Sequence, residues 1–197
     1  MKKITPSIIL AVFIASFAQA QSGNKISLSL GPDLNFPFNT GRNDNGSTRN
    51  YYQNGIGGTL KAELPVSSFL HITVSAGYIH YFTNAHYLYI DPLAYVAGGS
   101  YDNQPKPPPY LFMPIKAGLQ YYYSKYMYID AEAGAAIKLN SVSKNSFIYS
   151  GGLGGVIPFN AKNGLDIGLR YERGYEITGY QYPMNQIGIR IAYKRSF

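Results

Sequence analysis

The sequence predicts an all-β protein, an eight-stranded antiparallel up-and-down barrel, on three observations. First, 21 glycines, 20 tyrosines and only 14% charged residues fit an all-β chain with many tight turns better than a helical one. Second, alternation of apolar and polar residues with a period of two recurs in eight segments. Third, the connections between these segments are alternately short and long, which is typical of a barrel with turns at one end and loops at the other.

The eight expected strands are taken in order along the chain. They cover residues 26–34, 56–64, 70–78, 111–121, 127–138, 147–159, 165–172 and 186–197. In the last segment Ile187, Ile189 and Ile191 share one face, while Arg190 and Lys194 share the other. The alanine-rich segment 127–138 could be helical, but helical spacing would place charges all round it, so a strand is favoured. The segment 147–159 is glycine-rich and can still alternate. Each strand has about the 10 residues that a tilted strand needs to cross a bilayer.

The connections divide into two classes. Short turns are expected at 65–68, 124–125 and 160–163, and mostly longer loops at 38–50, 83–109, 139–146 and 173–184. An even number of strands returns both termini to the end that carries the short turns, which in a bacterial barrel is the periplasmic end.

The first twenty residues resemble a secretory signal peptide. Lys2 and Lys3 precede an apolar run at 8–17, and Ala18-Gln19-Ala20 follows as a cleavage site. The run is too short for a membrane helix. We therefore expect a signal peptide over 1–20 and one barrel domain over 21–197, with the formal charge falling from +7 to +5 when the two leader lysines are removed. The sequence contains no cysteine, which excludes a lipoprotein anchor and disulfides.

The apolar side of the strands could face either the interior of the barrel or its outside. A soluble, lipocalin-like carrier would turn its apolar side inward, whereas a membrane barrel turns it outward. Glycines on the charged face, such as Gly118, Gly134 and Gly168, favour a narrow charged lumen. Aromatic residues also gather toward strand ends, as in interfacial girdles. They are Phe69, Tyr121, Tyr123, Tyr126, Phe159 and Phe197 at the turn end, and Tyr51, Tyr52, Tyr81, Phe82, Tyr110, Phe147, Tyr149 and Tyr175 at the loop end.

The final strand carries a more specific resemblance. Its sequence, Gln186 to Phe197, alternates and ends on a phenylalanine, with Tyr193 on the same face. It resembles the C-terminal strand of small outer-membrane β-barrel domain proteins, often called porin-like, of the eight-stranded OmpA/OmpX type. The resemblance implies a site in the outer membrane of a Gram-negative bacterium, lipid contacts, and recognition of Tyr193 and Phe197 by the barrel-assembly machinery. Arg195 departs from the apolar residue often found at that position in the family.

With the charged face inward, the lumen would hold charges of both signs. The expected network is Lys61, Glu63, Lys116, Asp130, Glu132, Asp166, Arg170, Glu172, Arg190 and Lys194. Because isolated charges in a narrow interior are costly, they should pair. Asp130 and Glu132 are candidate partners of Arg170 and Arg190, although the sequence does not fix the pairing, and we expect the side chains to plug the barrel. The alternative is a narrow porin-like channel for small solutes.

The sequence gives little support for metal, cofactor, nucleic-acid or catalytic sites. No metal-ligand spacing joins the three histidines, His71, His80 and His86, no cofactor motif is present, and scattered basic residues argue against nucleic acid. A lipid-modifying barrel enzyme would need a histidine and a serine together on the lipid-facing surface, but His71 and Ser75 share the inward face and His80 faces outward. No acid is expected to orient either histidine. We therefore expect no enzyme. The long loop 83–109, with Tyr87, Tyr89 and Tyr95, is the candidate for an extracellular ligand, although these side chains could also fold back onto the barrel mouth.

Overall fold

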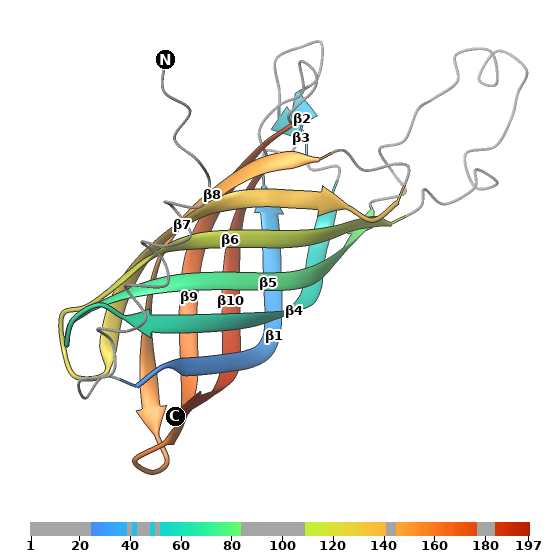
Figure 1. Cartoon of the computed structure of the whole chain (residues 1–197). Coiled ribbons are helices and arrows are strands. Elements are labelled where there is room, and N and C mark those ends of the chain that lie inside the picture. Colours follow the sequence, from blue (N-terminus) through green and yellow to red (C-terminus); the bar gives the residue numbers. More distant parts are fainter. Residues whose placement is uncertain are drawn as a thin grey trace, which may run out of the picture.

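Eight long antiparallel strands close into a single barrel, as predicted (Figure 1). The computed structural model describes residues 25–38, 41–42, 48–49, 52–83, 109–140, 145–176 and 184–197. The barrel strands are β1 (Ser27–Phe38), β4 (Tyr52–Pro65), β5 (Leu70–Thr83), β6 (Tyr110–Tyr122), β7 (Met127–Lys138), β8 (Ser146–Pro158), β9 (Asn163–Glu176) and β10 (Met184–Ser196). Each pairs with its neighbour in sequence, and β1 closes the barrel by pairing with both β4 and β10.

Two additional strands lie inside a segment that we expected to be a loop. β2 (Gly41–Arg42) and β3 (Thr48–Arg49) pair with each other as a separate two-stranded sheet. Figure 1 shows this small sheet beyond the end of the barrel at which β1 ends. Pairs of two residues are too short to produce a recognisable alternation, so the sequence pattern did not reveal them.

The short turns are held by side chains that replace backbone partners. In the turn between β8 and β9, Asn160 Oδ1 accepts hydrogen bonds from the backbone N–H groups of Lys162 and Asn163, both at 2.9 Å. In the turn between β4 and β5, Ser67 Oγ accepts one from the N–H of Leu70 at 3.0 Å. Asparagine and serine favour turns for this reason, and these turns keep one end of the barrel compact.

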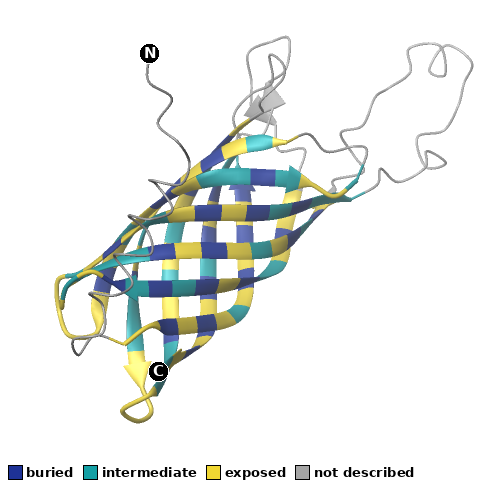
Figure 2. Ribbon diagram, in the orientation of Figure 1, coloured by how far each residue is buried: buried dark blue, intermediate teal, exposed yellow. Residues whose placement is uncertain are grey.

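The barrel is inverted in polarity compared with a soluble protein. Side chains alternate along every long strand between a buried inward face and an exposed outward face, which appears in Figure 2 as bands along the ribbons. The buried set is mostly polar or charged, and Asp33, Gln120 and Asp166 are fully enclosed. Large apolar side chains are exposed on the outside of all eight barrel strands, among them Leu30 and Leu119, which are 62% and 53% exposed. Within the described residues, no helix is long and apolar enough to cross a membrane.

One pair of glycines makes room for a large inward-facing side chain. Tyr128 lies opposite Gly154 in the β7–β8 register. A Cβ atom on Gly154 would lie 2.4 Å from the tyrosine Oη, and one on Gly168 would lie 3.3 Å from it. The tyrosine ring therefore occupies space that any larger residue at 154 would need, which gives these two glycines a packing role.

Candidate functional site

The site with the greatest density of functional groups is the barrel lumen. Six carboxylates and five basic side chains face it: Asp33, Glu63, Asp130, Glu132, Asp166 and Glu172, with Lys61, Lys116, Arg170, Arg190 and Lys194. All of them take part in at least one ion pair. The charges therefore neutralise one another almost completely inside the barrel.

The middle of the lumen is crossed by two lysines. Lys61 on β4 lies 2.9 Å from Asp130 on β7, although two strands separate these elements in the barrel wall. Lys116 on β6 similarly lies 2.8 Å from Glu172 on β9 and 3.2 Å from Glu132. Because β4 and β7, like β6 and β9, are not neighbours, these ion pairs bridge the lumen and fill its cross-section.

Two arginines form a second set of pairs along β9, β10 and β1. Arg190 Nη1 lies 2.9 Å from Asp166, which also accepts a 2.6 Å hydrogen bond from the hydroxyl of Tyr128. Arg170 Nη1 lies 2.9 Å from Asp33, and Thr59 donates to the other oxygen of that carboxylate. Both aspartates are thus enclosed and have hydrogen bonds to both of their oxygens, as a buried carboxylate requires.

Glu63 collects three partners near the end of the barrel that carries the short turns. Its Oε2 accepts a hydrogen bond from Lys194 at 2.5 Å and from the hydroxyl of Tyr122 at 3.0 Å. The Nδ1 of His71 lies 3.4 Å from the same oxygen. The rings of His71 and Tyr122 are 4.8 Å apart. His71, Tyr122 and Lys194 of this cluster line the floor of an open cavity of about 620 Å³ at that end, which we call the mouth cavity; Glu63 lies behind them and does not line it.

The opposite end of the lumen is apolar. Ile79, Tyr81, Phe112, Ala136 and Ile148 pack together inside the barrel at the end that carries the long loops. The hydroxyl of Tyr81 donates a 2.6 Å hydrogen bond across the lumen to Gln186. This cluster lies between the ion pairs and the long-loop end of the barrel.

Two small voids lie between the two ends of the described barrel. One void of about 30 Å³ lies among the ion pairs and one of about 40 Å³ lies beside the apolar cluster. A void of this size holds a few waters at most.

Two expectations about the lumen were wrong in detail. Asp130 and Glu132 pair with lysines rather than with the two arginines, because Asp166 is a diagonal neighbour of Arg190 on β9, the adjacent strand. An acid does accompany one histidine, since Glu63 approaches His71 from β4. The hydroxyl of Ser75 instead donates to Glu132 at 3.3 Å.

The girdle prediction also needs a correction. Tyr81, which we placed among the rim aromatics, points inward and is only 2% exposed. Its odd position on β5 puts it on the lumen face, opposite to the exposed Phe82. Tyr51 lies outside the described residues.

Three lumen residues were left out of the expected charge network. Tyr128 shares the alternation of Asp130 and Glu132 and was therefore expected on the inward face, as Asp33 was beside Ser27 and Ser29, but neither was included in the network. Tyr122 was not assigned to the lumen, although it has the same parity as Lys116 and Gln120 on β6.

The remaining candidate residues lie away from the lumen. Tyr193 is exposed on the outside and donates a 2.6 Å hydrogen bond to Asn163, and the N–H of Phe197 bonds to the carbonyl of Ile26 at 3.0 Å. The signal peptide, His86 and the loop residues Tyr87, Tyr89 and Tyr95 lie outside the described residues. Among the described residues, no group of three metal-ligating side chains could hold an ion.

Comparisons with known proteins agree on the fold. No protein-family model matches the sequence, and no curated protein sequence matches it. Several solved structures do. The chain is similar to Ail of Yersinia pestis, with a TM-score of 0.51, 12% identity, and coverage of 88% of this chain and 98% of that one. The outer membrane protein AlkL, solved in lipid bilayers, gives 0.53 and 12%, covering 88% and 90%. OprG from Pseudomonas aeruginosa gives 0.51 and 11%, covering 88% and 95%.

These similarities extend over nearly the whole of each matched barrel. Because the sequence identities are only 11% to 12%, they show a shared fold and nothing more specific. Strand number, closure and inverted polarity all agree with it. The chain has the fold of the small eight-stranded outer-membrane β-barrels.

Proposed function

We propose that this protein is an integral outer-membrane barrel that serves as a closed, non-conducting anchor for its surface loops. The observation that carries the proposal is the combination of an apolar outer surface with a lumen filled by ion pairs. Monomeric soluble proteins rarely expose apolar patches larger than a few hundred Å². Here the exposed apolar side chains surround the barrel, which suits hydrocarbon rather than water.

Several features support a closed anchor over a channel. The lysines that bridge the lumen and the apolar cluster above them occupy successive levels of the barrel. Opening a path through the level of the ion pairs would separate buried charges, and a buried charge left without its partner is strongly destabilising. The role that corresponds to a closed anchor is in envelope structure or in surface interaction through loop 83–109. During biogenesis the barrel-assembly machinery would recognise Phe197, and in the membrane the outer surface would contact lipid.

Membrane fractionation and gel mobility test whether the protein is an integral outer-membrane barrel. A folded barrel in the outer-membrane fraction should resist carbonate extraction and migrate differently before and after boiling in detergent. Recovery of the protein in the soluble periplasmic extract, with no mobility shift, would contradict it.

Planar-bilayer recordings test whether the barrel is closed to ions. The purified, refolded barrel should give no steady conductance. Reproducible single-channel steps, abolished when the protein is boiled, would favour the narrow-channel alternative. Deleting residues 86–104 should leave the gel shift intact and remove any binding of cells to a surface ligand, which separates the role of the loop from that of the barrel.

A further inference from the structure

The mouth cavity has an excess of basic side chains, whereas basic and acidic side chains nearly balance in the rest of the lumen. Its lining includes Lys25, Lys125, Lys162, Lys194 and His71. None of the eighteen residues that line it has an acidic side chain. Its volume of about 620 Å³ falls within the range of roughly 300 to 1,000 Å³ that is usual for sites of small ligands.

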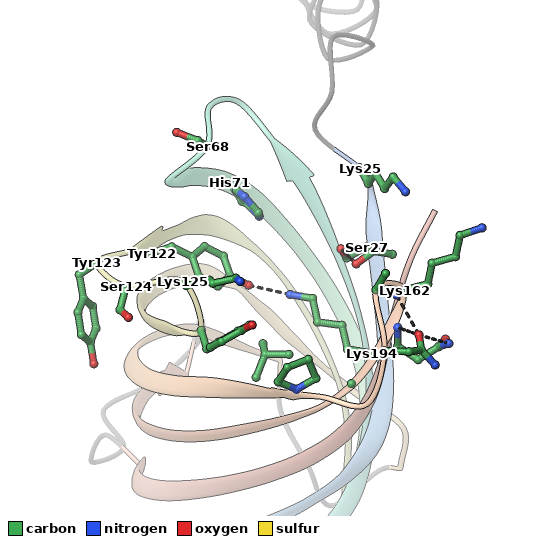
Figure 3. A pocket seen from close by; sticks show the side chains of 18 residues that line it. Lys25, Ser27, Ser68, His71, Tyr122, Tyr123, Ser124, Lys125, Lys162 and Lys194 are labelled. Carbon is green, nitrogen blue, oxygen red and sulfur yellow. Dashed lines mark hydrogen bonds between the residues drawn. The ribbon is translucent and has the colours of Figure 1, made fainter.

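The charges of this cavity differ in whether they are already paired. Lys194 on the floor is neutralised by Glu63. Lys25, Lys125 and Lys162 are exposed, and no ion pair joins them to another side chain in the described part of the chain. Figure 3 shows Lys25 and Lys162 on one side of the mouth, Tyr123 and Ser124 on the other, and His71, Tyr122 and Lys194 between them. The rim therefore carries uncompensated positive charge around a polar floor.

The remaining polar groups are also suited to an anion. Hydroxyls from Ser27, Ser68, Ser124 and Ser196 and amides from Asn160 and Asn163 line the cavity. No arginine does, and Arg195 nearby faces outward with its guanidinium 5.3 Å from the ring of Phe197. Lysine ammonium groups act as point charges with three donors each, and several of them around one cavity can bind the oxygens of more than one phosphate group.

We propose that the mouth cavity binds a ligand that carries several phosphate groups. Its position on the periplasmic side rests on the proposed function, because that function sets the orientation of the barrel. The phosphates can come from a soluble oligophosphate or from the headgroups of the inner leaflet, and both would use the same lysines.

The first experiment titrates the complete refolded barrel, in nonionic detergent, with sodium tripolyphosphate by calorimetry. We expect saturable binding that weakens as salt is added. The double variant Lys125→Gln, Lys162→Gln should weaken binding by roughly three- to thirty-fold, the loss that two exposed charge contacts produce. The matched control Lys138→Gln, Arg195→Gln removes the same net charge from outside the cavity and should bind like the wild type.

A second arm separates the two sources of phosphate. The barrel is placed in phosphatidylcholine vesicles with or without phosphatidylglycerol, and backbone amide NMR signals of residues 122–126 and 160–164 are followed. Shifts caused by phosphatidylglycerol, and lost in the Lys125, Lys162 variant, identify headgroups. Shifts caused only by tripolyphosphate identify a soluble ligand. Either result supports the phosphate site.

Absence of shifts and of binding with both probes would overturn it, as would equal weakening in the control variant. Neither outcome depends on where the protein resides in the cell. A soluble protein that still binds tripolyphosphate would therefore refute the membrane proposal and leave the cavity assignment standing.

Discussion

The pairing of Asp166 with Arg190 offers the sharpest test of the lumen network. Asp166 is fully buried, with Arg190 at 2.9 Å and the Tyr128 hydroxyl at 2.6 Å. In Asp166→Ala the guanidinium stays in the lumen without its carboxylate. Removing one partner of a buried ion pair costs about 3 to 5 kcal/mol, and we expect the free energy of unfolding to fall by that amount.

The second half of this test is a double-mutant cycle. Because Arg190→Met removes the stranded charge, the double variant Asp166→Ala, Arg190→Met should be destabilised by clearly less than the sum of the two single variants. The folded fraction is followed in urea by gel mobility and circular dichroism, since the chain contains no tryptophan for fluorescence. The exposed Lys138→Ala serves as a control and should change stability by less than about 0.5 kcal/mol. Additive losses, or an Asp166→Ala variant as stable as the wild type, would refute the reasoning.

Three further changes probe other parts of the barrel by the same unfolding measurement. Gly154→Val should destabilise the barrel by about 1 to 3 kcal/mol, because the valine side chain would overlap Tyr128. An unchanged urea midpoint of unfolding would show instead that the Tyr128 ring moves freely. Ile115→Arg, on the outer surface near the middle of β6, should cost about 2 to 4 kcal/mol in lipid vesicles, whereas a soluble barrel would tolerate it without loss. Tyr81→Phe should cost about 1 to 3 kcal/mol by leaving Gln186 without its buried donor, and a gain in stability would mean that the hydrogen bond is unimportant.

The strands and their faces could be predicted from the sequence because alternation reports directly on each residue. Ile187, Ile189 and Ile191 face out and Arg190 and Lys194 face in, as their parity indicated. The closed order of strands also followed from the alternation of short and long connections.

The pairing inside the lumen could not be predicted, because it depends on register and on distances across the barrel. Asp33 and Arg170 are 137 residues apart, and they meet only because β1 closes onto β10 beside β9. Likewise Lys61 reaches Asp130 across the lumen rather than along the wall. Nor does any sequence pattern reveal that the turn end opens into a cavity, since that depends on where the chain around Lys125 and Lys162 comes to lie.

The central claim is that the apolar face meets lipid and the charged face does not. Because the chain has no tryptophan, one introduced by substitution reports on a single position. Leu169→Trp places an indole on the outside of β9, and Phe112→Trp places one inside, next to the void of about 40 Å³ that can accept its extra volume. The barrel is reconstituted in phospholipids brominated at several acyl depths, and quenching of fluorescence is measured. Strong quenching at 169 with little at 112 is the predicted result, and quenching at 112 without quenching at 169 would contradict it.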